Sequence, residues 1–446
     1  MNHDARGIPV SSGSADAIAR YETAIGQLQS YVGDPIATID GALAESPDFV
    51  AGHLMKALTL ATLAERQYAP AIAQSIAAAR EHGARANGRE LGMLQAACQL
   101  ADGDWHAACR SLDAVLADNP RDALALQVAH LMDFYRGDAL NLRNRVARVL
   151  PHWSRDVPGY SYVLGMHAFG LEEMNQYPEA EETARAALAI EPKDGWAVHA
   201  ATHVMEMQGR IGEGIDWLVS RERDWAPDNG FAFHNFWHLA LFHLDGADHT
   251  KALDLYDRAV HPVPAQMLLT LVDATALLWR LALDGADVGP RFGEVADEWE
   301  AKLDGEGGYY AFNDLHAALA FAATGRDAAT TRLLHAVARA AEGGGTNAAM
   351  EREVGLPLVR AIAAYGRGRF DEAADLIAPV RDIAHRFGGS HAQRDVLSLT
   401  LIDAARRAGR ASLAKHVLSE RLVAKPGGAW GRRILARIDA TPAAPH

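Results

Sequence analysis

Apolar residues recur three and four positions apart along most of the chain, which is the pattern of amphipathic helices. From about residue 18 onward, such segments follow one another with short polar turns between them. No segment alternates convincingly between apolar and polar residues, so strands are not expected. The pattern predicts an all-α protein.

The helical segments repeat in a common frame. The segments G-D-W-H-A-A, N-Q-Y-P-E-A and G-R-F-D-E-A each place an aromatic residue after a turn residue and an alanine three positions later. In three places an alanine precedes a proline by twelve residues: Ala108 and Pro120, Ala180 and Pro192, Ala414 and Pro426. This is the frame of the 34-residue tetratricopeptide repeat, in which a small residue lets two helices approach and proline ends the pair.

The frame predicts a right-handed solenoid of antiparallel helix pairs over residues 18–435. It lies between an N-terminal tail (1–17) and a disordered C-terminal tail (436–446), with hinge turns near 261–264 and 342–350. The first helix of each pair should line the concave groove. The pairs are expected at roughly 18–50, 52–86, 89–122, 123–156, 161–194, 195–228, 230–262, 265–303, 309–342, 354–388 and 392–428.

Two histidine pairs stand on consecutive first helices, His199 with His203 and His234 with His238. Because a helix turns 100° per residue, His199, His203 and Glu206 fall within about 60° of one another. The frame turns this stripe towards the groove. If the two helices are neighbours, four imidazoles and a carboxylate converge.

The register of the second helix has two solutions. The preferred one packs Phe233, Phe236 and Trp237 into the core and turns His234 and His238 to the groove. The other packs Phe236, Leu239, Ala240 and His243, and burying His243 without a partner is costly.

Histidines at i and i+4 are a common way for a helix to chelate a transition metal. We therefore predict that His199, His203 and His234 hold zinc or another divalent transition metal, with Glu206 and His238 as catalytic groups. The alternative is a set of polar side chains that hydrogen-bond a ligand or each other.

The composition supports helices and restricts the partners. The 446 residues are 49% hydrophobic with only 18 prolines, and the formal charge of −14 argues against binding to nucleic acid or anionic membranes. No apolar run is long enough to span a bilayer, and the N-terminus has no signal-peptide core, so a cytoplasmic protein is expected. A homodimer is left open. Cys98 and Cys109 are expected as inert thiols.

A second candidate site is the segment G-G-S-H-A-Q-R-D. Ser390 is expected as the N-cap of a helix whose first turn holds Gln393, Arg394 and Asp395. This geometry suits an anion, and Arg394 could clamp a carboxylate or phosphate. Salt bridges between repeats are the equal alternative for Arg394 and Asp395.

Further polar residues are predicted to contact a ligand. Trp196 takes a groove position where it could stack on a substrate, and Asn235 could orient a ligand through its amide. Asn313 and His316 stand at the head of the 309–342 repeat and complete this set.

Other polar residues fit packing at least as well. Asp273 and Arg280 are seven apart and share a helix face, which is either groove or a structural pair. His130 and His167 take packing positions, where a satisfied core histidine is the default.

Three motifs, H-A-A-T-H-V-M-E-M-Q-G-R, H-N-F-W-H-L-A-L-F and G-G-S-H-A-Q-R-D-V, resemble the tetratricopeptide repeat protein 38 family. The likeness runs from about residue 15 to residue 435. It implies an α-helical solenoid and names no reaction or substrate. It keeps His130 among the ligand-binding candidates, although H-L-M-D-F-Y departs there from the family's pattern.

Two functions follow from these patterns. The first is a solenoid that binds a small molecule or peptide in a groove rich in histidine, glutamate and tryptophan. The second is an enzyme with its site in the same groove, a hydrolase that depends on a metal or on a His/Glu general base. The binding function ranks first by a small margin.

Overall fold

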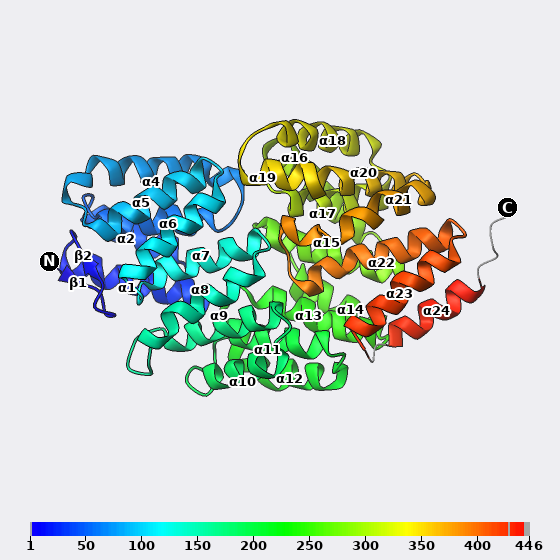
Figure 1. The fold of residues 1–446 in the computed structure, drawn as a ribbon, viewed down its shortest axis with the longest axis horizontal. Helices are drawn as coiled ribbons and strands as arrows, with labels where there is room; N and C mark the ends of the chain where they lie inside the picture. Colours follow the sequence, from blue (N-terminus) through cyan, green and yellow to red (C-terminus); the bar gives the residue numbers. More distant parts are fainter. Residues whose placement is uncertain (1, 427–428, 441–446) are drawn as a thin grey trace. The chain divides into compact units, whose positions relative to one another are not determined.

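The structure, a computed structural model, is an all-α solenoid of helix pairs and describes residues 2–426 and 429–440. The predicted fold class is confirmed (Figure 1). The N-terminal tail adds a short antiparallel ladder between β1 (Asn2–His3) and β2 (Pro9–Val10), which the sequence did not indicate. Its alternation is too brief to be seen as a pattern.

The chain forms two compact units. The first contains the residues up to Ala201 together with Arg223–Phe231, and the second contains Thr202–Glu222 and the chain from Ala232 onward. The division therefore falls within a helix pair and not at either expected hinge turn.

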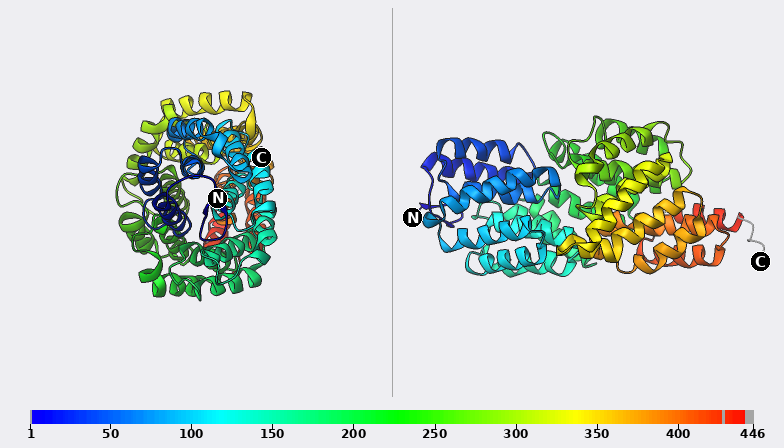
Figure 2. Two further views of the ribbon diagram at one scale, coloured as in Figure 1. Left: turned by 90° about the vertical axis from the view of Figure 1, so that its left-hand side faces the viewer. Right: turned by 90° about the horizontal axis from the view of Figure 1, so that it is seen from above.

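Helix pairs of the first unit lie where the repeat frame places them (Figures 1 and 2). Short 3₁₀ turns, η1 (Arg66–Tyr68), η2 (Gly83–Arg85) and η3 (Leu150–His152), join some of them. The pairs are α1 (Ala15–Ser30) with α2 (Pro35–Glu45), α3 (Val50–Ala61) with α4 (Ala69–Glu81), α5 (Gly88–Ala101) with α6 (Trp105–Asp118), α7 (Ala123–Tyr135) with α8 (Ala139–Val149), and α9 (Tyr160–Glu173) with α10 (Tyr177–Leu188).

The pair α11 (Gly195–Met207) and α12 (Ile211–Trp225) crosses the division, and the second unit continues the array. Two π-helical segments, η4 (Tyr256–Val260) and η5 (Glu351–Gly355), and a 3₁₀ turn, η6 (Ala384–Phe387), interrupt it. Its further helices are α13 (Ala232–Asp245), α14 (His249–Leu255), α15 (Leu268–Leu283), α16 (Arg291–Glu306), α17 (Ala311–Thr324), α18 (Asp327–Glu342), α19 (Gly345–Met350), α20 (Leu356–Gly366), α21 (Phe370–Arg381), α22 (His391–Arg407), α23 (Ala411–Ala424) and α24 (Ala429–Ala440).

First helices in the second unit are buried around most of their circumference. α15 packs not only against α13 and α17 but also against α22, which belongs to a repeat much later in the chain. The inner side chains of these helices therefore meet other helices, so the inner stripe forms a packed core within this unit.

Two segments differ from the sequence-based expectation. Gly345–Met350 forms helix α19 within the expected hinge turn at 342–350. Helix α24 continues to Ala440 because Ile434 and Ile438 bury one face, so the first part of the expected C-terminal tail is helical. The rest of that tail, residues 441–446, lies outside the described residues. Over the described ranges, no helix is both long and apolar enough to cross a bilayer.

Small residues allow the paired helices to approach as the frame predicts. Ala108, Ala180 and Ala414 are fully buried. In α12 a glycine plays this part, since a Cβ atom on Gly214 would overlap the ring of Phe242 in α13.

Gly214→Ala should therefore lower the free energy of unfolding by about 1–3 kcal/mol, because the added methyl overpacks a filled contact. Gly212→Ala in the same helix is the matched control, since a Cβ there meets nothing within 4 Å. The control should be neutral or stabilising by up to about 1 kcal/mol, through helix propensity. Urea unfolding monitored by circular dichroism distinguishes the two, and equal effects would contradict the packing described for Gly214.

Candidate functional site

A cluster of buried imidazoles forms the centre of the candidate site in the second unit. His203 of α11 and His234 and His238 of α13 are at most 5% exposed, and each offers a ring nitrogen within 4.8 Å of the others. The ring centroids of His203 and His238 are 4.4 Å apart, and those of His234 and His238 are 4.9 Å apart. The structure thus brings together three of the four predicted histidines within one unit.

Carboxylates orient two of these rings. His234 Nδ1 lies 2.6 Å from Asp273 Oδ2 of α15, and His238 Nδ1 lies 2.7 Å from Glu206 Oε2 of α11. An Nδ1–H group that donates to a carboxylate leaves Nε2 as the lone-pair nitrogen of a neutral ring. Burial lowers the pKa of His203 and of His238, so both rings are neutral at pH 7.

The observed orientation of α13 matches the preferred register only in part: Phe236 and Trp237 are buried as expected, but Phe233 is half-buried and the two histidines are buried instead of facing an open groove. Trp237 is fully buried, and His234 and His238 point to carboxylates on neighbouring helices. His243, which the other register would bury, is only partly covered.

Glu206 connects the histidine cluster to a cluster of charged residues. Its Oε1 atom accepts a hydrogen bond from Lys425 Nζ at 3.0 Å, and Lys425 also pairs with Asp245 at 3.0 Å. Burial opposes the charge on Glu206, but Lys425 and His238 outweigh it and hold the pKa of this carboxyl well below its usual value. Burial likewise opposes the charge on Lys425, and Asp245 and Glu206 raise its pKa.

A second ion pair joins α22 to α23 beside this network. Arg421 Nη2 lies 2.7 Å from Asp395 Oδ2, and Arg421 Nε lies 2.8 Å from Asp395 Oδ1. Burial opposes the charge on Asp395, but the Arg421 guanidinium lowers the pKa of its carboxyl. Asp395 therefore forms a salt bridge, but within the 392–428 helix pair and not between repeats as the alternative had it.

These groups form one wall of a pocket between α11, α22 and α23, with a volume of about 280 Å³. Leu397, Ser398 and Ala424 also line it. The pocket is lined by equal numbers of cations and carboxylates: Arg381, Arg394, Arg421 and Lys425, with Glu206, Asp382, Asp395 and Glu420.

A smaller cavity of about 20 Å³ continues inward from the same charged groups to Arg280 of α15. Arg280 donates to the carbonyl oxygens of Ala392 and Gln393 at 2.8 and 3.1 Å and lies over the ring of Trp237. Burial lowers the pKa of this guanidinium. Asp273 hydrogen-bonds to His234. Asp273 and Arg280, which the sequence placed on one helix face, therefore have different partners and do not pair with each other.

At the start of α22, where an anion site was predicted, side chains of the helix itself cap its N-terminus. Ser390 accepts a hydrogen bond from the backbone N–H of Gln393, and Gln393 Oε1 accepts one from the backbone N–H of Ser390. Gln393 is only 3% exposed. Arg394 donates to the carbonyls of Gly388 and Gly389, with its guanidinium 3.3 Å from the His391 ring, and it lines the pocket.

The remaining predicted residues of the second unit lie elsewhere. Asn235 is 1% exposed within α13. His316 is fully buried in α17 and donates from Nδ1 to the carbonyl oxygen of Phe312 at 2.8 Å. Asn313 is half-buried in the first turn of α17. Their predicted contacts with a ligand stay predictions.

Three predicted residues join an aromatic cluster in the first unit. His199 lies one helical turn before His203, and its ring is 5.0 Å from Trp196, 5.2 Å from Phe169 and 5.1 Å from Phe231. His130 packs edge-on against Trp196 at 5.8 Å. Trp196 is 6% exposed, so it is mainly a packing residue in this unit.

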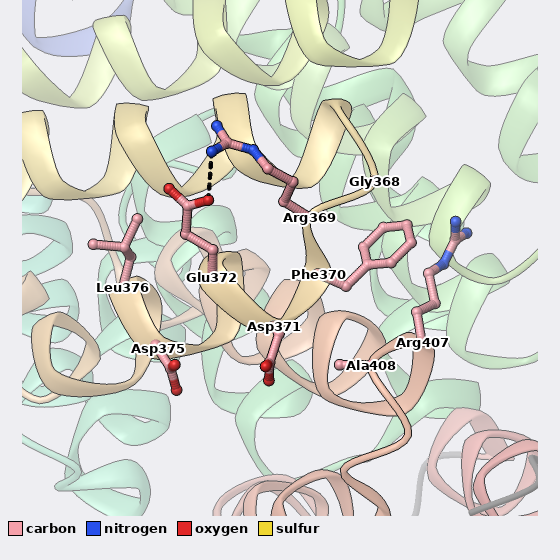
Figure 3. Close-up of a pocket in the computed structure, with 9 residues that line it drawn as sticks. All are labelled: Gly368, Arg369, Phe370, Asp371, Glu372, Asp375, Leu376, Arg407 and Ala408. Atoms are coloured by element: carbon pink, nitrogen blue, oxygen red, sulfur yellow. Dashed lines mark ion pairs between the residues drawn. The ribbon is translucent and has the colours of Figure 1, made fainter. Parts of the chain in front are cut away.

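A larger hollow lies elsewhere in this unit, at the turn between α20 and α21 (Figure 3). It measures about 690 Å³ and is bordered by exposed side chains. Arg369 pairs with Glu372 at 2.6 Å, and Arg407 lies over the ring of Phe370. Exposed pairs of this kind are worth little energetically and satisfy each other, so we do not place the function there.

Sequence reasoning missed Lys425, Arg421 and Asp245. The one signal was the spacing of Arg421 and Lys425, which places both cations on one face at the end of a helix. Their carboxylate partners lie far away in the chain, with Lys425 and Glu206 separated by 219 residues.

Comparisons with known proteins leave the family open. No model of a protein family matches the chain. The solved structures that it resembles include the human IFIT1 dimer with m7Gppp-AAAA, at 13% identity over 96% of each chain with a TM-score of 0.44. Yeast Tom70 is similar at 12% identity, over 94% of this chain and 86% of that one, with a TM-score of 0.36. Because these TM-scores are below 0.5, we base the fold assignment on the helix pairs observed in this structure and not on the similarity.

The buried neutral His316 predicts a pH effect on stability. Burial lowers its pKa to about 4, whereas the unfolded chain takes up this proton near pH 6.5. The folded state therefore loses stability as the pH falls from about 6.5 to 4, by up to about 3 kcal/mol from this group. His316→Asn should flatten the pH dependence of urea unfolding in this window. His335→Asn, at an exposed position of α18, is the control. An unchanged slope in His316→Asn would contradict the prediction.

Proposed function

We propose that the protein binds a small ligand carrying both charges, such as a free amino acid or a short peptide, in the pocket between α11, α22 and α23. The observation that carries the proposal is the wall of buried, mutually compensated charges around Glu206 and Lys425. Buried ion pairs are weak evidence of stabilisation, because desolvation offsets most of their attraction. A network kept at such a cost beside a pocket favours a role in recognition.

The pocket's chemistry defines the ligand class. A ligand amino group is complementary to Glu206 and Asp395, and a ligand carboxylate is complementary to Arg394 and Lys425. Because cations and carboxylates are balanced, neither a simple anion nor a simple cation matches the whole wall.

Its size limits the ligand further. Small-molecule pockets span about 300–1,000 Å³, and this one, at about 280 Å³, is just below that range. A single amino acid or the end of a peptide fits this volume, whereas a folded partner would have to bind elsewhere.

Glu206 favours binding over hydrolysis. A general base works best with a pKa near the operating pH, whereas hydrogen bonds from Lys425 and His238 hold this carboxylate ionised and weakly basic. The hydrolase alternative therefore ranks second.

We also propose, on the three motifs alone, that the chain is related to the tetratricopeptide repeat protein 38 family. The cytoplasmic location, the open homodimer and the absence of nucleic-acid binding stay predictions of the sequence.

Filling the pocket should weaken ligand binding. Ala424 lines it, whereas the adjacent Val423 is 84% exposed and does not, so Ala424→Phe and Val423→Phe form a matched pair. Free amino acids and dipeptides are titrated by calorimetry, each beside its N-acetyl amide, which lacks both charges. In Ala424→Phe, a steric clash of about 1.4 kcal/mol or more should weaken ligand binding at least tenfold. Val423→Phe should bind the ligand as tightly as the wild-type chain.

Arg394→Gln should weaken the binding of the charged ligands and leave the binding of the N-acetyl amides unchanged. A short RNA in the same panel tests the expected absence of nucleic-acid binding. If no amino acid or dipeptide binds the wild-type chain, or if both phenylalanine variants bind like wild type, the proposal fails.

A further inference from the structure

We infer that His203, His234 and His238 form a binding site for a divalent transition metal such as zinc. This site is distinct from the ligand pocket, although Glu206 contacts both. The inference goes beyond the proposed binding function and does not depend on it.

The arrangement of the three donors supports the site. His234 and His238 are four residues apart on α13, so successive turns present both rings on one face, and His203 approaches from α11. Zinc–nitrogen bonds of about 2.1 Å place tetrahedral ligands about 3.4 Å apart. Because one nitrogen from each ring already lies within 4.8 Å of the others, small side-chain movements would complete the coordination.

The carboxylates behind the rings are the second argument. Metal-bound histidines usually donate their other N–H to a carboxylate, which fixes the ring and raises its basicity. Asp273 does this for His234 and Glu206 for His238, at 2.6 and 2.7 Å. Two such pairs within one cluster are more specific than an i, i+4 spacing alone.

Charge and donor type define the ion. Burying a divalent cation needs nearby negative charge. Glu206 shares its charge with Lys425, while Asp273, fully buried, contributes a second carboxylate. Imidazole donors select zinc, copper, iron or nickel, whereas calcium and magnesium prefer oxygen ligands. Three protein ligands leave a fourth position for water or another donor.

His316 provides a control within the same unit. It is as buried as His203, but its Nδ1 donates to a backbone carbonyl and it does not belong to the cluster. Substituting His203 or His316 removes one buried imidazole in each case. Only the His203 substitution also removes a proposed metal ligand.

The experiment measures metal in the full-length chain, purified without a histidine tag, loaded with zinc and desalted. Mass spectrometry of the metal should find about one equivalent in wild type and in His316→Asn, and less than about a tenth of that in His203→Asn. Asp273→Asn should weaken zinc about 10–100-fold in competition with a chromophoric chelator, as loss of a supporting carboxylate typically does. Circular dichroism and gel filtration establish that each variant is folded.

Ala424→Phe separates this inference from the proposed function, since it fills the pocket and should leave zinc binding unchanged. If His203→Asn does not fold, cobalt(II) bound to wild type decides: intense visible bands of a tetrahedral nitrogen site support the inference, and their absence overturns it. Wild type that holds less than about a tenth of an equivalent after zinc loading, or folded His203→Asn that retains a full equivalent, also overturns it.

Discussion

Glu206 holds a carboxylate, 2% exposed, between the ammonium group of Lys425 and the imidazole of His238. Neither partner could be removed without leaving a charge or a polar group buried and uncompensated, and such losses cost more than the intact pair contributes. The carboxylate also ties α11 to α13 and to the end of α23. The surrounding polar groups of the second unit are arranged around this contact.

Two chemical environments meet at this carboxylate. On one side lies a cluster of buried imidazoles, and on the other a pocket with cations and carboxylates in equal number. Because one oxygen of Glu206 accepts from Lys425 and the other faces His238, a change in either environment alters the field at the other. Glu206 is therefore common to the proposed ligand site and the proposed metal site. The residues that would bind the metal ion directly are different from those that line the ligand pocket.

Packing within the second unit explains why the inner stripe of its repeats is buried. α15 packs against α22 as well as against its sequence neighbours, so the inner faces of α13, α15 and α17 are covered by helices. Polar side chains on those faces must therefore satisfy one another. The charged pocket opens instead beside α22 and α23, where side chains such as Ala424 and Arg394 remain accessible.

The sequence by itself determined the helix pairs, the small residues between them and the histidine spacing, because each depends on contacts within one repeat. It also identified Glu206 and the N-cap at Ser390 from local periodicity. Only the tertiary structure decided that Asp273 supports His234, that Lys425 meets Glu206, and that Gln393 serves its own helix as a cap. The physical reason is that the packing of successive repeats within the second unit brings helices together that are distant in the chain, and this packing is the sum of many small angles that no single motif encodes.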